Sequence, residues 1–233
     1  MATMTLDMQN IVDELLNLSG VVAVQLTGSQ LSKHNTASSD IDLVVYTDTA
    51  ETIKCITRTY NKDGTLVHWN FAPISSIILA PDTIPCWRIF GNMYLLKLTG
   101  DDFWSNTCAG KYLHGLLLKY KYQISLLCAK SVIARLNKIA QKISTTELFE
   151  GDTKSIFNVL YAAKLLDYID IDEKYIVDFK HQKSTLQDVY SNMRGNCTFQ
   201  FMDTHTLMRE IDEFNKMFYN EFQTLLKEIK NEP

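Results

Sequence analysis

Two apolar, strand-like runs separated by a polar loop constrain the fold of this chain more than any other feature. Residues 21–26 and 43–46 are rich in β-branched residues, which favour strands. Gly28 and Ser29 follow the first run, and ten mostly polar residues separate them from an Asp-Ile-Asp sequence that begins at residue 40. The pattern predicts two strands that hold a glycine-serine turn and a pair of carboxylates at their ends.

The carboxylates of Asp40 and Asp42 indicate a metal site. Side chains two residues apart on a strand share a face and lie about 7 Å apart, so both can contact ions on one side. Mg²⁺ (or Mn²⁺) prefers oxygen ligands, and two such ions about 3.5 to 4 Å apart serve phosphoryl transfer. Gly28 permits close backbone approach, so nearby N–H groups and the Ser29 hydroxyl can hold the phosphates of an NTP.

The alternative is an ordinary connection between two strands. The glycine would then serve only the turn, and the aspartates would be solvated groups at a strand end. Either half of the pattern alone favours that interpretation. Both halves together, each at the end of a strand and at this spacing, favour the metal and phosphate site.

The same residues resemble the signature of the polymerase-beta-like nucleotidyltransferase superfamily. The matching segments are Thr-Gly-Ser at residues 27–29 and Asp-Ile-Asp-Leu at residues 40–43. Within the superfamily the chain is most similar to the RNA-repair-associated branch, which has a helical half after its catalytic sheet. That branch carries a helix with Lys, His and Arg, and here Lys154 matches the lysine whereas Asn158 and Tyr161 stand at the other two positions. The resemblance implies that Lys154 neutralises phosphate charge.

The resemblance also implies a third carboxylate on a later strand, where it binds metal and accepts the proton of the acceptor hydroxyl. The expected strand covers residues 65–71, and its alternation places His68 and Asn70 on one face. Three interpretations stay open: His68 acts as base or ligand, Asp63 or Asp82 reaches in from a loop, or the site binds nucleotide without turnover. Imidazole suits Mn²⁺ better than Mg²⁺. An ordinary half-exposed polar role for His68 is the further alternative.

Strand and helix patterns predict an α+β fold with two domains. Residues 1–104 are expected to form a small mixed-sheet nucleotidyltransferase domain, and residues 105–233 a helical domain. Apolar spacing predicts an amphipathic helix over residues 8–16, and residues 48–60 are expected to form a crossover helix. A long apolar stripe over residues 207–229 predicts a final helix that belongs to the core, with a dimer seam as the alternative. No strand is expected after Gly100.

Composition and cysteine usage point to the cytosol. No apolar run of this 233-residue chain reaches the eighteen or so residues that cross a bilayer, and the first ten residues lack the basic and apolar regions of a signal peptide. We therefore expect a cytoplasmic protein without a membrane partner. The five cysteines are widely spaced and odd in number, which favours reduced, structural thiols over disulfides or a zinc site.

Charge is uneven along the chain. Residues 108–146 hold seven Lys or Arg and no Asp or Glu, although the net charge is −4. Tyrosines interleave with lysines there, so this stretch is either a surface for triphosphate or RNA, or a solvated helix face. The sequence pI of about 5.7 disfavours a general nucleic-acid coat.

The leading hypothesis is an enzyme that moves a nucleoside monophosphate from an NTP to an acceptor hydroxyl of an RNA end, a protein or a small molecule. Asp40 and Asp42 would hold the metal ions, with His68 near them. The alternative is a catalytically degenerate nucleotide-binding regulator or antitoxin-like partner protein. A third possibility is an interaction protein without nucleotide chemistry. Neither the preferred base nor the oligomeric state has a signature in these residues.

Overall fold

The computed structural model describes residues 6–31, 40–48, 58–62, 65–79, 102–140, 203–231 and, with gaps, 153–193. Its contacts form two compact units, each assembled from separate parts of the chain. The first unit combines Met1–Ile77, Leu96–Lys121 and Glu213–Pro233, and the second combines Ile78–Leu95 and Tyr122–Asp212. The division into a catalytic domain of residues 1–104 and a helical domain of residues 105–233 stays a prediction.

A five-stranded sheet in the order β3-β4-β2-β1-β5 forms the centre of the first unit. The strands are β1 (Val21–Thr27), β2 (Ile41–Thr47), β3 (Arg58–Lys62), β4 (Thr65–Pro73) and β5 (Phe103–Trp104). β2 and β4 are parallel and the other pairs are antiparallel, so the sheet is mixed. The α+β class and the three predicted strands are confirmed.

Two expectations about the edges of the sheet are wrong. Arg58–Lys62 is strand β3, so the last residues of the expected helix over 48–60 pair with β4 instead. β5 contributes Phe103–Trp104 beyond the point where no further strand was expected. Both strands are short and depend on a partner distant in sequence, and such pairing overrides local propensity.

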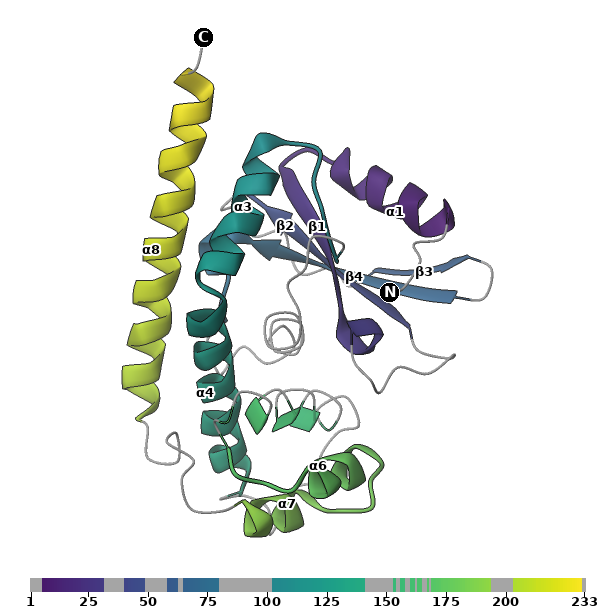
Figure 1. The fold of residues 1–233 in the computed structure, drawn as a ribbon, viewed down its shortest axis with the longest axis vertical. Coiled ribbons are helices and arrows are strands. Elements are labelled where there is room, and N and C mark those ends of the chain that lie inside the picture. The colour runs from purple at the N-terminus through teal and green to yellow at the C-terminus, as the bar shows by residue number, and fades with distance from the viewer. Residues whose placement is uncertain are drawn as a thin grey trace. The chain divides into compact units, whose positions relative to one another are not determined.

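One face of the sheet packs against helix α1 (Leu6–Leu16), as Figure 1 shows. The helix buries Met8, Ile11, Val12 and Leu15 against alternate residues of the strands. Each buried side chain of this size contributes about 1.5–3 kcal/mol relative to exposure. Trp69 and Phe71 of β4 pack on this face, so His68 lies on the opposite one.

Helix α3 (Cys108–Lys119) packs on that opposite face, at the β1 and β5 side. The His114 ring stacks on Phe103 with centroids 4.5 Å apart, and burial lowers the pKa of His114. A Cβ at Gly110 would overlap the Val22 carbonyl oxygen, so this glycine permits the close approach of the helix to β1. The helix begins at its cap Thr107, whose hydroxyl accepts a hydrogen bond from the Gly110 N–H.

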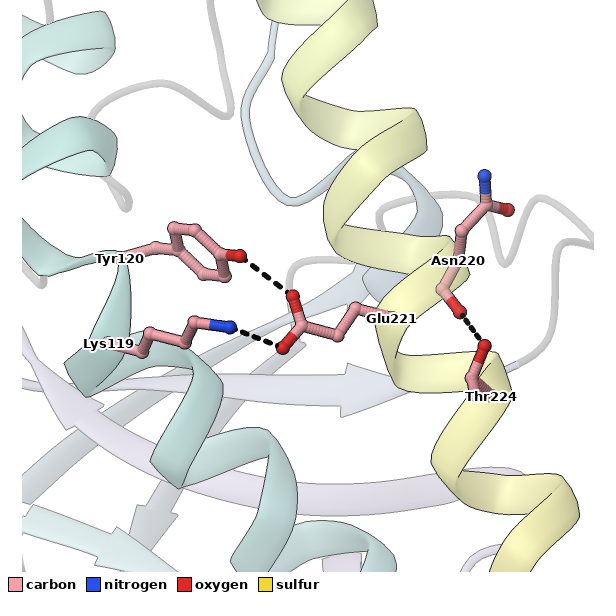
Figure 2. Close-up of polar contacts among 5 residues, drawn as sticks. All are labelled: Lys119, Tyr120, Asn220, Glu221 and Thr224. Atoms are coloured by element: carbon pink, nitrogen blue, oxygen red, sulfur yellow. Dashed lines mark hydrogen bonds and ion pairs between the residues drawn. The ribbon is translucent and has the colours of Figure 1, made fainter.

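The final helix, α8 (Thr204–Asn231), confirms the predicted apolar stripe as core from Leu207 to Phe222, whereas Leu225 and Ile229 are half-buried. Its buried apolar residues are Leu207, Ile211, Phe214, Phe218 and Phe222. In the first unit the Glu221 carboxylate of α8 accepts hydrogen bonds from Lys119 Nζ at 2.6 Å and from the Tyr120 hydroxyl at 2.7 Å (Figure 2). The Tyr120 ring also packs edge-on against Phe214 and Phe218.

The second unit contains most of α4 (Lys121–Ala140), together with α6 (Glu173–Lys180), α7 (Leu186–Asn192) and the start of α8. Lys130 of α4 pairs with Glu210 of α8 at 2.7 Å. α7 starts with a capping box between Thr185 and Asp188. Among the described residues, no helix has both the length and the apolar character needed to cross a bilayer.

We expect Glu221→Gln to lower the midpoint of thermal unfolding by about 2 °C, because it weakens both hydrogen bonds to α8. The hydrogen bond from Lys119 is the main cause that lowers the pKa of Glu221. A lowered folded-state pKa stabilises the protein above the unfolded value, so this contribution should disappear as the pH falls through the folded-state value. Glu213→Gln, at an exposed position on the same helix, is the control and should leave the midpoint unchanged.

Candidate functional site

Strand register places Asp42 and His68 next to each other at the centre of the sheet. Asp42 pairs with Thr27 across the antiparallel β1–β2 ladder and with His68 across the parallel β2–β4 ladder. Paired residues in neighbouring strands point to the same face, so Thr27, Asp42 and His68 form one row. This row lies on the face opposite α1. The register thus places His68, and not Asn70, beside the Asp-Ile-Asp segment.

Asp40 lies just before β2, and its carboxylate lies beside the His68 imidazole of this row. The His68 Nε2 atom lies 3.6 Å from Asp40 Oδ2, and each side chain is 26% exposed. The separation is within ion-pair range and longer than a good hydrogen bond. The partial exposure leaves both groups accessible to a ligand. The structure therefore brings together the two aspartates and the histidine that the sequence singled out.

Gly28 allows the Asp42 carboxylate to approach the chain after β1. Its φ of +78° lies in the left-handed region that favours glycine. A Cβ at this position would overlap Asp42 Oδ2 and would lie 2.9 Å from Asp42 Cγ. Gly28 begins the short 3₁₀ helix η1 (Gly28–Leu31), which also contains Ser29. The side chain of Ser29 lies outside the described residues, so its phosphate contact stays a prediction.

Two hydrogen bonds tie the backbone of the aspartate segment to the β1–η1 turn. The hydroxyl of the buried Thr27 donates to the Asp42 carbonyl oxygen at 3.3 Å. Gln30 Nε2 donates to the Asp40 carbonyl oxygen at 3.4 Å. Neither contact was predicted from the sequence, where the signal is Thr27 itself, a hydroxyl residue at the end of an apolar strand pattern.

A buried polar pair lies further along the same face. The Tyr46 hydroxyl donates to Gln25 Oε1 at 2.8 Å, and both side chains are fully buried. Gln25 precedes Thr27 by two residues, and Tyr46 follows Asp42 by four, so both continue the face that carries the row. Gln25 Nε2 has no hydrogen-bond partner in the part of the chain that the structure describes. The pair links the candidate site to the core under α3.

The carboxylates of Asp40 and Asp42 are the oxygen donors that a metal ion at this site would use. In the described ranges, no three His, Cys, Asp or Glu side chains form a group that could hold one ion. Mg²⁺ commonly takes only one or two carboxylates and completes its shell with substrate phosphates and water. The chemistry of the donors therefore fits an ion that binds together with a triphosphate.

Other predicted site residues lie elsewhere. Lys154, Asp63 and Asp82 are outside the described residues. Asn70 pairs with Val44, one step along the same face from the Asp42 row. The nearest described alternative to a third carboxylate is therefore His68.

The basic stretch is partly neutralised by acidic residues of α8. Lys119 pairs with Glu221, and Lys130 pairs with Glu210. These two lysines stabilise helix packing, which favours the structural interpretation for this part of the stretch. The side chains at 135–140 and residue 142 lie outside the described residues.

Comparison with known proteins agrees with this geometry. Residues 8–84 match the family model described as the nucleotidyltransferase domain. The matched segment contains β1 to β4 and with them Gly28, Asp40, Asp42 and His68. It supports nucleotidyl transfer as the general chemistry of this part of the chain. No curated protein matches the chain.

We expect Gly28→Ala to reduce any metal-dependent activity of this site by about 100-fold, because the new methyl group displaces the Asp42 carboxylate. The left-handed backbone adds about 1–2 kcal/mol of strain. Gly115→Ala is the matched control, since a Cβ at that exposed helical position meets nothing within 4 Å. It should raise the free energy of unfolding by about 0.5–1 kcal/mol and leave activity unchanged. Equal activity of the two variants would contradict the assigned role of Gly28.

Proposed function

We propose that this protein transfers a nucleoside monophosphate from an NTP to an acceptor hydroxyl and releases pyrophosphate. The observation that carries the proposal is the convergence of Asp40, Asp42 and His68 on one face of the sheet, beside the left-handed Gly28. The nucleotidyltransferase match over residues 8–84 supports the reaction class. An acceptor oxygen attacks the α-phosphorus, the bond to the β-phosphate oxygen breaks, and pyrophosphate leaves.

Asp40 and Asp42 are proposed to hold divalent metal ions, Mg²⁺ or Mn²⁺. When bound, such ions stabilise developing charge on the phosphates and promote deprotonation of the attacking hydroxyl. Gly28 lets the backbone of η1 approach the phosphates, and Ser29 is proposed to add its hydroxyl. The hydrogen bonds from Thr27 and Gln30 keep the aspartate backbone against that turn.

His68 is proposed to accept the proton of the acceptor hydroxyl. It stands beside Asp42 in the sheet, and its imidazole faces Asp40. A histidine in this position also favours Mn²⁺ over Mg²⁺.

A second candidate function is nucleotide binding without turnover, as in a regulator or antitoxin-like partner. The observation that favours it is the imidazole of His68, which stands beside Asp42 where the family resemblance implies a third carboxylate. Its signature is saturable, metal-dependent NTP binding without pyrophosphate release. The RNA-repair-associated relationship and a phosphate contact by Lys154 are further parts of the proposal under either function, whereas an acceptor, whether an RNA end, a protein or a small molecule, belongs to the first function alone.

Asp42→Asn should lower pyrophosphate release by at least about 1,000-fold, because it removes a charged metal ligand while keeping the side-chain shape. The assay offers each of the four NTPs with Mg²⁺ or Mn²⁺, with total RNA and protein extract as acceptors. Asp48→Asn, just beyond the other end of β2, is the control and should leave release unchanged. Turnover that survives Asp42→Asn would exclude the mechanism.

Substitutions at His68 separate the two candidate functions. If the imidazole is the base, His68→Ala should lower release by about 100-fold to 10,000-fold. If the site has only lost its third acid, the wild type should be silent and His68→Asp should gain Mg²⁺-dependent release. Asn70→Asp is the matched control, because Asn70 pairs with Val44 and not with Asp42, and it should gain nothing.

A further inference from the structure

The candidate site has two different sides. The Asp42 carboxylate lies against Gly28, toward η1, whereas Asp40 faces His68 on β4. In the proposed function the triphosphate binds at the η1 side. In-line transfer requires the acceptor and the leaving pyrophosphate on opposite sides of the α-phosphorus. The acceptor therefore approaches from the β4 side.

Leu66 is an exposed apolar residue on that β4 side. It precedes His68 by two residues and thus shares its face of the strand. In the parallel pairing of β2 with β4, Ile41 lies opposite Val67. Asp40 and Leu66 each precede one of these two residues, so they are neighbours at the same end of the two strands. Leu66 is 43% exposed, so it offers apolar area to a ligand on this side of the site.

We propose that Leu66 determines acceptor specificity and selects acceptors whose reacting hydroxyl adjoins an uncharged, apolar group. The inference rests on the proposed function, because the direction of approach follows from where the triphosphate binds. An acceptor of this kind covers the exposed part of Leu66 while its hydroxyl reaches Asp40 and His68. Burial of apolar area adds affinity for such an acceptor and none for a purely polar one.

Charge on this side disfavours the alternative acceptor, an RNA end held by its phosphates. On the site face, β4 carries Leu66, His68 and Asn70, and none of these is a Lys or Arg. In β3, Asn61 and Thr59 pair with Leu66 and His68, and neither is a charged residue. Phosphodiester binding relies on Lys and Arg, and the strand register places neither residue type on this face of β3 or β4.

A binding titration of the full chain tests this without turnover. The probes are 2-phenylethanol, whose hydroxyl adjoins an apolar group, and glycerol, which has no apolar group. Ligand-observed NMR reports their binding in the presence of Mg²⁺ and a non-hydrolysable NTP analogue. Leu66→Asn should weaken 2-phenylethanol binding by about threefold to tenfold and leave glycerol unaffected. Leu118→Asn, at a position 45% exposed on α3, is the control and should change neither. Equal binding to wild type and Leu66→Asn overturns the proposal.

A second experiment measures acceptor choice during turnover. Wild type receives α-labelled NTP with equal concentrations of 2-phenylethanol and a short oligouridylate that has a free 3′-hydroxyl. The assignment is supported if the Leu66→Asn variant transfers less label to 2-phenylethanol than wild type does, while its midpoint of thermal unfolding is unchanged. Preferential labelling of the oligouridylate overturns it. Absence of pyrophosphate release under every condition rejects the proposed function instead, and the binding titration then decides the role of Leu66 alone.

Discussion

The parallel pairing of β2 with β4 is the contact on which the candidate site depends. It joins two strands with β3 and a connecting segment between them in sequence, and its register sets Asp42 against His68. A shift of one residue would exchange the faces of the whole strand and would move His68 under α1. The apolar residues that alternate with the site residues oppose that shift, because Val67, Trp69 and Phe71 pack on the α1 side. Hydrophobic packing on one face of the sheet thereby sets the positions of Asp42 and His68 on the other face.

A second constraint acts at the end of β1. The Asp42 carboxylate occupies the space that a side chain at position 28 would fill, and the backbone there is left-handed. Glycine therefore serves two needs at once, the turn into η1 and the room for a carboxylate. The hydrogen bonds from Thr27 and Gln30 hold the same two segments together through the backbone. The position of the carboxylates is thus set by the sheet and by the β1–η1 turn, which would suit the proposed metal and phosphate site.

Helix α3 and the C-terminal part of α8 complete the first unit from distant parts of the chain. Their contact combines the hydrogen bonds that Glu221 accepts from Lys119 and Tyr120 with the packing of the Tyr120 ring on Phe214 and Phe218. Lys119 and Lys130 of the basic stretch bind carboxylates of α8 and stabilise packing. A run of positive charge in the sequence therefore does not become a uniform positive surface. The β4 side of the candidate site carries an exposed leucine, Leu66, near Asp40 and His68.

The sequence by itself determined the strands β1, β2 and β4, the helices α1 and α8, and the pairing of a glycine turn with two carboxylates. These features follow from local periodicity and from residue types whose chemistry is specific, so they need no knowledge of distant contacts. Only the tertiary structure decided the edge strands β3 and β5, the choice of His68 over Asn70 beside Asp42, and the ion pairs of the basic stretch. Each of these depends on register or on contacts between residues far apart in the chain, and a strand pattern with a period of two fits several registers equally well. The long-range packing of the apolar face selects one of them.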